Sequence, residues 1–372
     1  MERSEILKSC KRIVVKVGTS TLTYSNGLPN YDAMEKLIRQ LANAKNKGYE
    51  IVLVTSGAIG VGMAKLKLKQ RPKTIPEKQA CAAVGQGLLM HLYEKIFSEY
   101  CINVAQILLT REDVNDRQRF LNARNLMFEL IKSDIVPIIN ENDAVAVDEI
   151  KIGDNDNLSA LVAMLSDADL LVILSDIDGL YDKDPNIYED AKLISTVKKI
   201  NDNILKMAGD SKTKIGTGGM VTKIQAAKIA TSSGIPMIIA KGSLDGVITR
   251  ILNGEEIGTI FLSNKKPLSC KRGWIAFAKK PKGEIYIDDG AVKALVEDNK
   301  SLLSPGIKKI EGNFLKGDCV LILSLDGKQV AKGLINYSSL EISDIMLKNP
   351  EGFNQLYKEI VHRDNMVIIW EE

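Results

Sequence analysis

The chain has 372 residues, 45% hydrophobic and 26% charged, which is typical of a globular protein with one large domain and a smaller one. Its net charge of +3 is too small to indicate nucleic-acid binding by itself, and no apolar run approaches the ~20 residues of a membrane-spanning helix. The only histidines are His91 and His362, so a histidine base or a histidine-rich metal site is nearly excluded. Carboxylates, lysines, backbone amides and Mg²⁺ remain for chemistry.

The N-terminal segment and the cysteines indicate a cytoplasmic location. Residues 1–11 are charged and lack the apolar core of a signal peptide. The five cysteines are irregularly spaced and include no C-x-x-C pair, so reduced thiols in a cytosol fit best. They are Cys10, Cys81, Cys101, Cys270 and Cys319.

The first expected strand, residues 12–17, contains a lysine in an otherwise β-branched segment. Either this Lys16 extends along a sheet edge towards solvent, or the protein needs its charge. The Gly-Thr-Ser turn at residues 18–20 favours the second interpretation, because glycine lets backbone amides approach an anion closely.

A second strand, residues 50–55, follows a helix expected over residues 31–47 and ends in Ser56 and Gly57. Two successive strands therefore end in small residues just before helices. This pattern indicates one continuous polar rim at the carboxyl edge of a parallel sheet. Either turn alone is equally well explained as a glycine-rich turn that permits tight packing.

The following segments continue the alternation of helix and strand. A helix expected over residues 117–132 carries Arg117, Arg119 and Arg124, which we interpret as a solvated face. The run at residues 170–174 is almost fully apolar, as expected for a central parallel strand. The other expected elements are a helix at 76–100 and strands at 103–109 and 235–240.

The densest group of polar residues lies between a buried strand at 135–139 and the helix that follows it. The group comprises residues 140–145 (Asn-Glu-Asn-Asp-Ala-Val) and 153–159 (Gly-Asp-Asn-Asp-Asn-Leu-Ser). Asp156 or Asn157 could cap the helix. Capping uses one or two side chains, so the surplus of carboxylates and amides indicates a polar ligand site at the sheet edge.

A glycine-rich segment indicates a second site, for an anion. Gly216-Thr217-Gly218-Gly219-Met220 leads into a helix that reaches about residue 233. Glycines at the start of a helix present backbone amides and the positive end of the dipole to an anion. Lys223 falls in the first turn, where the dipole repels it, and this local conflict indicates a function. Neither a Walker A motif nor a complete G-x-G-x-x-G motif occurs.

Composition changes near residue 265, and the elements beyond it are short and strand-like, for example at residues 283–287 and 319–323. Asp326 and Gly327 form a hairpin turn signal. We therefore expect a separate, small β-rich domain.

Lysines, glycines at strand ends, and Asp and Asn side chains without histidine suit phosphoryl transfer, in which catalysis is mostly positioning and charge neutralisation. A carboxylate acceptor fits best, because its pKa of ~4.3 leaves it ionised at pH 7 and no base is needed. Repulsion between two anions is then the main difficulty. Lys16, Lys223 and Mg²⁺ offset it.

Taken together, the motifs resemble the glutamate 5-kinases, a family of the amino-acid kinase superfamily, and they occur in that family's order across roughly the first 260 residues. Each motif alone would be weak. The C-terminal part resembles a PUA domain, which many bacterial members carry. The motifs of the first part are residues 15–20, 54–59, 120–124, 139–145, 153–160 and 216–223; those of the second include residues 290–291, 301–303, 305–307, 312–314, 317–318 and 331–333.

The resemblance implies an α/β fold with an open, mainly parallel sheet between helices. It implies an amino-acid kinase domain at residues 1–263 and a PUA domain at 270–372. It further implies that Lys16 and Lys223 stabilise the transferring phosphoryl group and that Asp156 holds both lysines. Ser175 is a departure, because threonine is frequent there, but the hydroxyl is kept. The implied glutamate-binding residues are Ser56, Gly57, Asp143 and Asn155, and the implied ATP-binding residues are Lys16, Ser175, Asp176, Gly216, Thr217, Gly218, Gly219, Met220 and Lys223.

Within the glutamate site, we expect Asp143 to accept from the substrate ammonium group and Asn155 to donate to a substrate carboxylate. The implied reaction uses ATP and Mg²⁺ to form γ-glutamyl phosphate, the first intermediate of proline synthesis. Family members are commonly inhibited by proline and form homodimers or homotetramers.

Two alternatives stay open. One is another kinase of the superfamily, acting on acetylglutamate, aspartate, carbamate or UMP. The other is an RNA-binding regulator, because PUA domains often bind RNA. Residues 271–372 contain 15 Lys and Arg and 15 Asp and Glu, however, and RNA binding normally needs a basic surface.

Overall fold

The computed structural model describes residues 3–24, 26–146, 155–209, 219–264, 267–348 and 359–370. The chain forms two compact units, Met1–Pro267 and Leu268–Glu372. Each unit has its own hydrophobic core. The predicted domain limits at residues 263 and 270 stay a prediction.

The first unit is built on one eight-stranded sheet with the strand order β3-β4-β2-β1-β5-β7-β8-β6. The strands from β3 to β7 in this order are parallel, and β8 runs antiparallel to β7. The predicted mainly parallel α/β fold is therefore confirmed. The strands are β1 Arg12–Val17, β2 Glu50–Val54, β3 Val104–Leu109, β4 Val136–Glu141, β5 Leu170–Ser175, β6 Thr196–Val197, β7 Met237–Lys241 and β8 Thr259–Phe261.

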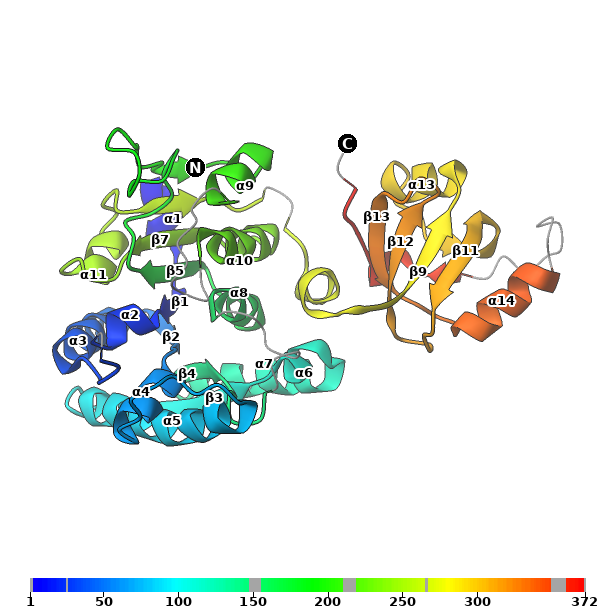
Figure 1. Ribbon diagram of the computed structural model, residues 1–372. Coiled ribbons are helices and arrows are strands. Elements are labelled where there is room, and N and C mark those ends of the chain that lie inside the picture. Colours follow the sequence, from blue (N-terminus) through cyan, green and yellow to red (C-terminus); the bar gives the residue numbers. More distant parts are fainter. Residues whose placement is uncertain are drawn as a thin grey trace. The chain divides into compact units, whose positions relative to one another are not determined.

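Helices cover both faces of this sheet, with α8 and α10 on one side and α3 and α11 on the other (Figure 1). This arrangement explains the continuous apolar runs in the sequence, because a strand covered on both faces buries every side chain. All six residues of β5 are buried. The helices are α1 Arg3–Ser9, α2 Thr19–Leu22, α3 Tyr31–Asn46, α4 Ala58–Lys65, α5 Ile75–Ser98, α6 Arg111–Asn115, α7 Arg117–Lys132, α8 Asn155–Leu165, α9 Asp202–Gly209, α10 Met220–Ser232 and α11 Val247–Leu252.

Helix α5 begins with a capping box, in which Thr74 and Glu77 each accept a hydrogen bond from the other's backbone N–H. Two glycines then bring α5 against α4. A Cβ at Gly62 would lie 1.8 Å from the carbonyl oxygen of Cys81, and a Cβ at Gly85 would lie 1.8 Å from that of Ala58. Only glycine permits this approach, so the pair fixes α4 and α5 rigidly beside the end of β2.

The structure excludes the less favoured alternative for Lys16 and contradicts the interpretation of the arginines of α7. Lys16 lies in β1, between β2 and β5 at the centre of the sheet, and is only 6% exposed, so it is neither an edge residue nor a solvent-facing one. The arginines of α7 do not form a uniform solvated face. Arg119 is exposed, but Arg124 donates to the carbonyl oxygen of Leu165 at 2.8 Å and stacks on the Phe128 ring at 4.7 Å. Arg117 is half-buried.

The second unit is β-rich, as predicted. Strands β12 and β13 form an antiparallel hairpin whose turn contains Asp326 and Gly327, and Gly327 has a φ of +83°. A five-stranded sheet has the order β11-β9-β12-β13-β15, and β10 pairs with β14. The elements are α12 Cys270–Gly273, a π-helical turn Trp274–Ala278, β9 Pro281–Ile287, α13 Asp289–Val296, β10 Leu302–Leu303, β11 Ile307–Gly312, β12 Cys319–Ser324, β13 Gln329–Leu334, α14 Ser339–Lys348, β14 Glu359–Val361 and β15 Met366–Ile368.

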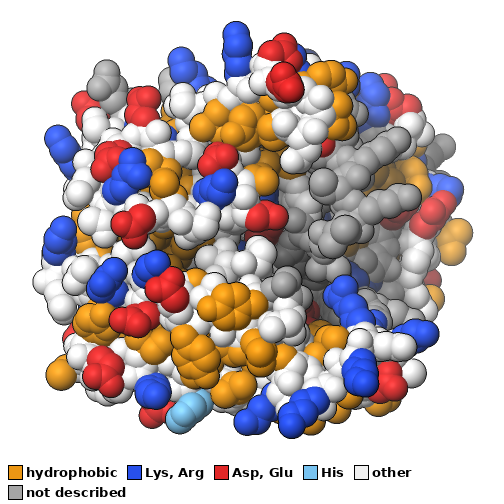
Figure 2. Space-filling model, turned by 60° about the vertical axis from the view of Figure 1, so that its left-hand side comes forward, with side chains coloured by type: hydrophobic (Ala, Val, Ile, Leu, Met, Phe, Trp, Pro, Cys, Tyr) orange, Lys and Arg blue, Asp and Glu red, His pale blue; other side chains and the backbone are white. Residues whose placement is uncertain are grey.

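Acidic and basic side chains are interspersed on the face drawn in Figure 2, without a large patch of one sign. None of the helices in the described ranges is long and apolar enough to cross a membrane.

Candidate active site

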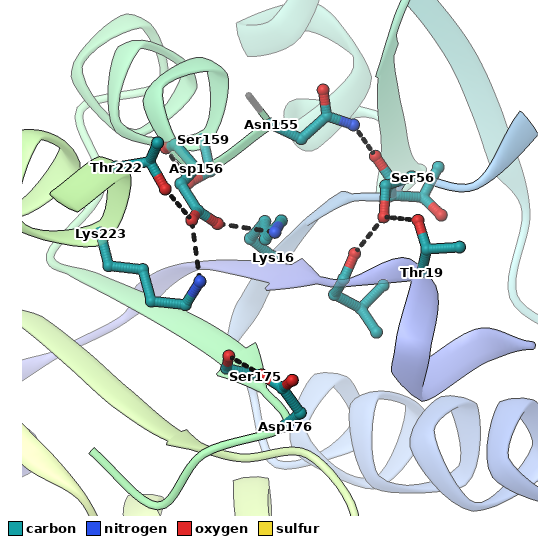
Figure 3. A network of polar contacts seen from close by, with 12 residues as sticks. Lys16, Thr19, Ser56, Asn155, Asp156, Ser159, Ser175, Asp176, Thr222 and Lys223 are labelled. Carbon is teal, nitrogen blue, oxygen red and sulfur yellow. Dashed lines mark hydrogen bonds and ion pairs between the residues drawn. The ribbon is translucent and has the colours of Figure 1, made fainter. Parts of the chain in front are cut away.

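The candidate site lies at the carboxyl edge of the sheet, where β1, β2, β4 and β5 end side by side. Lys16 is the last but one residue of β1, Ser56 follows β2 closely, and Ser175 ends β5. Helices α8 and α10 bring Asp156 and Lys223 to the same place (Figure 3). Residues separated by more than a hundred positions in the chain thus form one polar network.

Asp156 is the centre of this network and is fully buried. Its Oδ1 lies 2.6 Å from the Nζ of Lys16, and its Oδ2 lies 3.2 Å from the Nζ of Lys223 (Figure 3). The predicted meeting of the three side chains is therefore present in the structure. The Oδ2 atom also lies 3.1 Å from the hydroxyl of Thr222, which donates to it.

Burial alone raises the pKa of the Asp156 carboxyl, but the ammonium groups of Lys16 and Lys223 outweigh burial and leave this pKa below its ordinary value. Asp156 is therefore ionised at neutral pH. Lys16 and Lys223 are only 6% and 5% exposed, so two buried cations share one carboxylate. This three-residue cluster carries a net positive charge, which suits an anionic ligand.

Thr222 was missed by sequence reasoning. Its hydroxyl lies 2.8 Å from the carbonyl oxygen of Gly219 as well as near Asp156. The sequence did contain one indication, because Thr222 lies beside Lys223 in the first turn of a helix, where a threonine hydroxyl can form hydrogen bonds with nearby backbone and side-chain groups.

Helix α8 begins at Asn155, so Asp156 and Asn157 lie inside the helix and neither is its N-cap. The capping interpretation of these two residues is wrong. The side chain of Asp156 instead points to the lysines (Figure 3).

Asn155 starts a chain of amide groups that sequence reasoning did not find. Its Nδ2 donates to the carbonyl oxygen of Thr55 at 2.5 Å and to the Oδ1 of Asn140 at 2.8 Å. The Nδ2 of Asn140 donates in turn to the Oε1 of Gln86 at 2.8 Å. Because both amide protons of Asn155 are used, its expected donation to a substrate carboxylate is not what the structure shows.

Ser56 and Gly57 connect β2 to α4. The hydroxyl of Ser56 donates to the carbonyl oxygen of Val17 at 3.0 Å and accepts from the Thr19 hydroxyl at 3.2 Å (Figure 3). Gly57 has a φ of +94°, and a Cβ there would lie 3.1 Å from the Cγ2 of Thr19. The glycine is needed for this turn, and the turn holds the serine at the sheet edge.

A cavity of about 270 Å³ opens beside the amide chain. Its size lies just below the ~300–1,000 Å³ of common small-molecule pockets, so it suits a small ligand. Small side chains of α4 and α5 leave the space, and polar side chains from α5 and the end of β4 border it. The lining residues are Ala58, Ala82, Ala83, Gln86, Gly87, Gln106, Leu108, Glu141, Asn142, Asp143 and Ala144.

Ser175 and Asp176 lie at the end of β5, where the hydroxyl of Ser175 donates to the Oδ1 of Asp176 at 2.9 Å (Figure 3). Gly219 is the N-cap of α10, and Met220 is its first residue. The predicted nucleotide-site residues Gly216, Thr217 and Gly218 lie outside the described residues.

No group of three or more His, Cys, Asp or Glu side chains that could hold a metal ion occurs in the described ranges. Asp156 is engaged by two lysines.

Each of the two units matches a known protein family. Residues 11–241 match the amino acid kinase family, and residues 283–350 match the PUA domain. The chain is 57% identical to a glutamate 5-kinase of Thermoanaerobacter sp. (strain X514), over 96% of this chain and 98% of the relative. It is 50% identical to the glutamate 5-kinase of Carboxydothermus hydrogenoformans, over 98% and 99%.

Among solved structures, carbamate kinase from Giardia lamblia bound to AMP-PNP is similar in fold. It has a TM-score of 0.50 and 19% sequence identity, and the match covers 69% of this chain and all of that one. The predicted fold class is confirmed by the family match and the sheet topology together.

Proposed function

The chain belongs to the glutamate 5-kinases of the amino acid kinase family, and from this membership we propose that it transfers the terminal phosphoryl group of ATP to the γ-carboxylate of L-glutamate. The observation that carries the proposal is the buried cluster of Lys16, Asp156 and Lys223. A net positive cluster at the edge of a parallel sheet is suited to a reaction between two anions.

The chain's residues stabilise charge in this reaction. A carboxylate acceptor is already ionised at neutral pH, so no general base is required, and none of the described residues of the cluster needs to remove a proton. Lys16 and Lys223 offset the repulsion between the acceptor and the phosphate oxygens. Asp156 holds both ammonium groups in place at 2.6 and 3.2 Å.

For the nucleotide, we propose Lys16, Ser175, Asp176, the segment Gly216 to Met220 and Lys223. Support comes from helix α10, which begins directly after Gly219, because the N-terminus of a helix presents backbone amides and the positive end of its dipole to an anion. When bound, Mg²⁺ neutralises part of the phosphate charge.

For glutamate, we propose Ser56, Gly57, Asp143 and Asn155. Asp143 lines the cavity and supplies a carboxylate for the ammonium group of an amino acid. Ser56 lies on the turn that connects β2 to α4. Asn155 acts by holding the backbone of Thr55 next to Ser56, since its amide protons are used within the protein.

We also propose the wider setting that such a reaction implies: the first step of proline synthesis, inhibition by proline, assembly into homodimers or homotetramers, and a cytoplasmic location. Family membership supports these points, and five free thiols fit a reducing compartment. RNA binding by the second unit stays the less favoured alternative because its sequence is neutral overall.

An assay with ATP, Mg²⁺ and a panel of acids tests the proposal. We expect phosphorylation of glutamate, detected as acyl phosphate trapped by hydroxylamine. Turnover of acetylglutamate, aspartate, carbamate or UMP in place of glutamate would show that the site serves another acceptor.

Replacing Asp143 with alanine should raise the KM for glutamate by at least ~10-fold, because a charge-assisted contact is worth about 1.4 kcal/mol or more. The KM for ATP should stay within a few-fold. The melting temperature of the variant must be measured alongside, since structural damage could also weaken binding. A raised KM for ATP with an unchanged KM for glutamate, at normal stability, would assign Asp143 to the nucleotide instead.

Truncation after Pro267 should leave a folded kinase with measurable activity. The first unit has its own core and contains every proposed catalytic residue, and its length is ample for independent folding. Circular dichroism and the acyl-phosphate assay check this expectation. A folded but inactive truncated protein would show that the second unit contributes to the site.

A further inference from the structure

Gln86 has a buried hydrogen-bond donor without a partner. The residue lies in α5, lines the cavity and is 9% exposed. Its Nε2 is fully buried and makes no hydrogen bond to any of the described residues. Buried polar groups are nearly always hydrogen-bonded, so an unpaired donor beside a cavity points to a partner that the protein binds.

The direction of this donor is set by the backbone. The carbonyl oxygen of Thr55 can only accept, so the NH₂ group of Asn155 must face it, while the N–H of Glu141 can only donate, so the Oδ1 of Asn140 must face it at 2.9 Å. The NH₂ group of Asn140 is thereby turned towards Gln86, whose Oε1 accepts. A reversal of any amide in the chain would place two donors or two acceptors together. The Oε1 of Gln86 therefore faces Asn140, and its NH₂ group is the end of the side chain that is left to bind a ligand.

The backbone around Gln86 is fixed as well. The neighbouring Gly85 packs directly against the carbonyl oxygen of Ala58 in α4, so α5 cannot shift along or away from α4 without losing this contact. The next anchor on α5 is Tyr93, whose hydroxyl lies 2.7 Å from the hydroxyl of Thr55, both buried. Gln86 is thus held on a rigid helix, as a residue that selects a ligand should be.

The chemistry of the cavity indicates which ligand group this donor meets. Glu141 and Asp143 also line the cavity, and their carboxylates can pair with an ammonium group but repel a carboxylate. An amino acid carries both groups. A neutral amide donor can bind its carboxylate without adding charge to the site.

We propose that Gln86 is a specificity-determining residue of the acceptor site and that its Nε2 donates a hydrogen bond to a carboxylate oxygen of the bound acidic amino acid. This inference rests on the proposed function. It assigns to Gln86 the donor role that the sequence suggested for Asn155. The same amide chain reaches Asn155, the residue before Asp156, so it connects the residue that recognises the acceptor to helix α8, which also carries the carboxylate of the lysine cluster.

The variant Gln86→Glu tests this donor. Glutamate has nearly the same shape and keeps an oxygen that accepts from Asn140, but it replaces the NH₂ group with a carboxylate oxygen. We expect the KM for glutamate to rise at least ~10-fold, as for loss of a hydrogen bond to a charged group. We expect kcat and the KM for ATP to stay within about threefold, because the lost contact serves acceptor binding alone.

Two further variants are the controls. Gln118→Glu places the same charge change on an exposed position of α7 and should leave both KM values unchanged. Gln86→Met removes the donor without adding charge. Gln86→Met should also raise the KM for glutamate. If Gln86→Glu lowers the melting temperature by more than a few degrees, the result for Gln86→Met decides the test.

The outcomes distinguish a failure of the proposed function from a failure of the role proposed for Gln86. If the unmodified protein does not phosphorylate glutamate, the proposed function fails. If it does, and folded Gln86→Glu and Gln86→Met keep an unchanged KM for glutamate, Gln86 bonds only to water and the inference alone is overturned. A fall in kcat at unchanged KM would likewise overturn it, because Gln86 would then only support the structure.

Discussion

Replacing Lys223 or Lys16 with alanine should lower kcat by ~10²-fold or more, because each change removes a preorganised cation from the place where charge develops during phosphoryl transfer. Both ammonium groups are almost fully buried and are held by the same carboxylate. Water that fills the space cannot replace a fixed positive charge. The KM for glutamate should change less, because the proposed acceptor contacts lie on other side chains. Steady-state kinetics with both substrates varied measure these effects.

Lys241→Ala is a matched control for the two lysines. Lys241 ends β7 in the same sheet, but its side chain is 44% exposed and its Nζ lies 3.9 Å from Asp178, so it should change kcat by only a small factor. Near-normal kcat in both Lys16→Ala and Lys223→Ala would remove the two residues from the catalytic machinery.

Asp156→Asn should lower both stability and kcat. The variant keeps the shape of the side chain but leaves two buried ammonium groups without a counter-charge. Breaking a buried ion pair in this way costs about 3–5 kcal/mol of folding free energy. The lysines then repel one another and move, so kcat should fall by ~10²-fold as well. Chemical denaturation and the kinase assay measure the two effects.

The pH dependence gives a second readout for Asp156. Its pKa is lowered in the folded protein, so the unfolded chain takes up the proton at higher pH than the folded one. The stabilisation is therefore complete above the ordinary pKa of ~3.9 and is lost as the pH falls through the folded-state value. The stability difference between the unmodified protein and Asp156→Asn should shrink in that acidic range.

Asp167→Asn is the control for a carboxylate in an ordinary ion pair. Asp167 pairs with Arg124, but its side chain is 52% exposed, so the variant should lose no more than ~1 kcal/mol and no activity. Equal losses in Asp156→Asn and Asp167→Asn would mean that the buried cluster has no special role.

The sequence by itself determined the longer strands and helices of the first unit and their order along the chain, but not its short elements such as β6 and β8. Buried parallel strands require apolar β-branched runs, and the apolar run of β5 could therefore be predicted as a central strand. The glycines and polar residues that follow these strands marked the sheet edge that carries the site, because parallel strands bring their carboxyl ends together. The hairpin turn at Asp326 and Gly327 was equally readable, since few residues adopt the required positive φ.

Only the tertiary structure decided which side chains meet. A local pattern cannot tell a central strand from an edge strand, so the burial of Lys16 depended on β2 and β5 pairing with β1 from either side. In the same way, the amide chain joins Asn155 to Asn140 and Gln86, which come from α8, β4 and α5. The orientation of each amide follows from backbone groups that packing places opposite it. Hydrogen-bond partners far apart in the chain leave no periodicity in the sequence, and for this reason the donor of Gln86 became visible only once the helices and strands were in place.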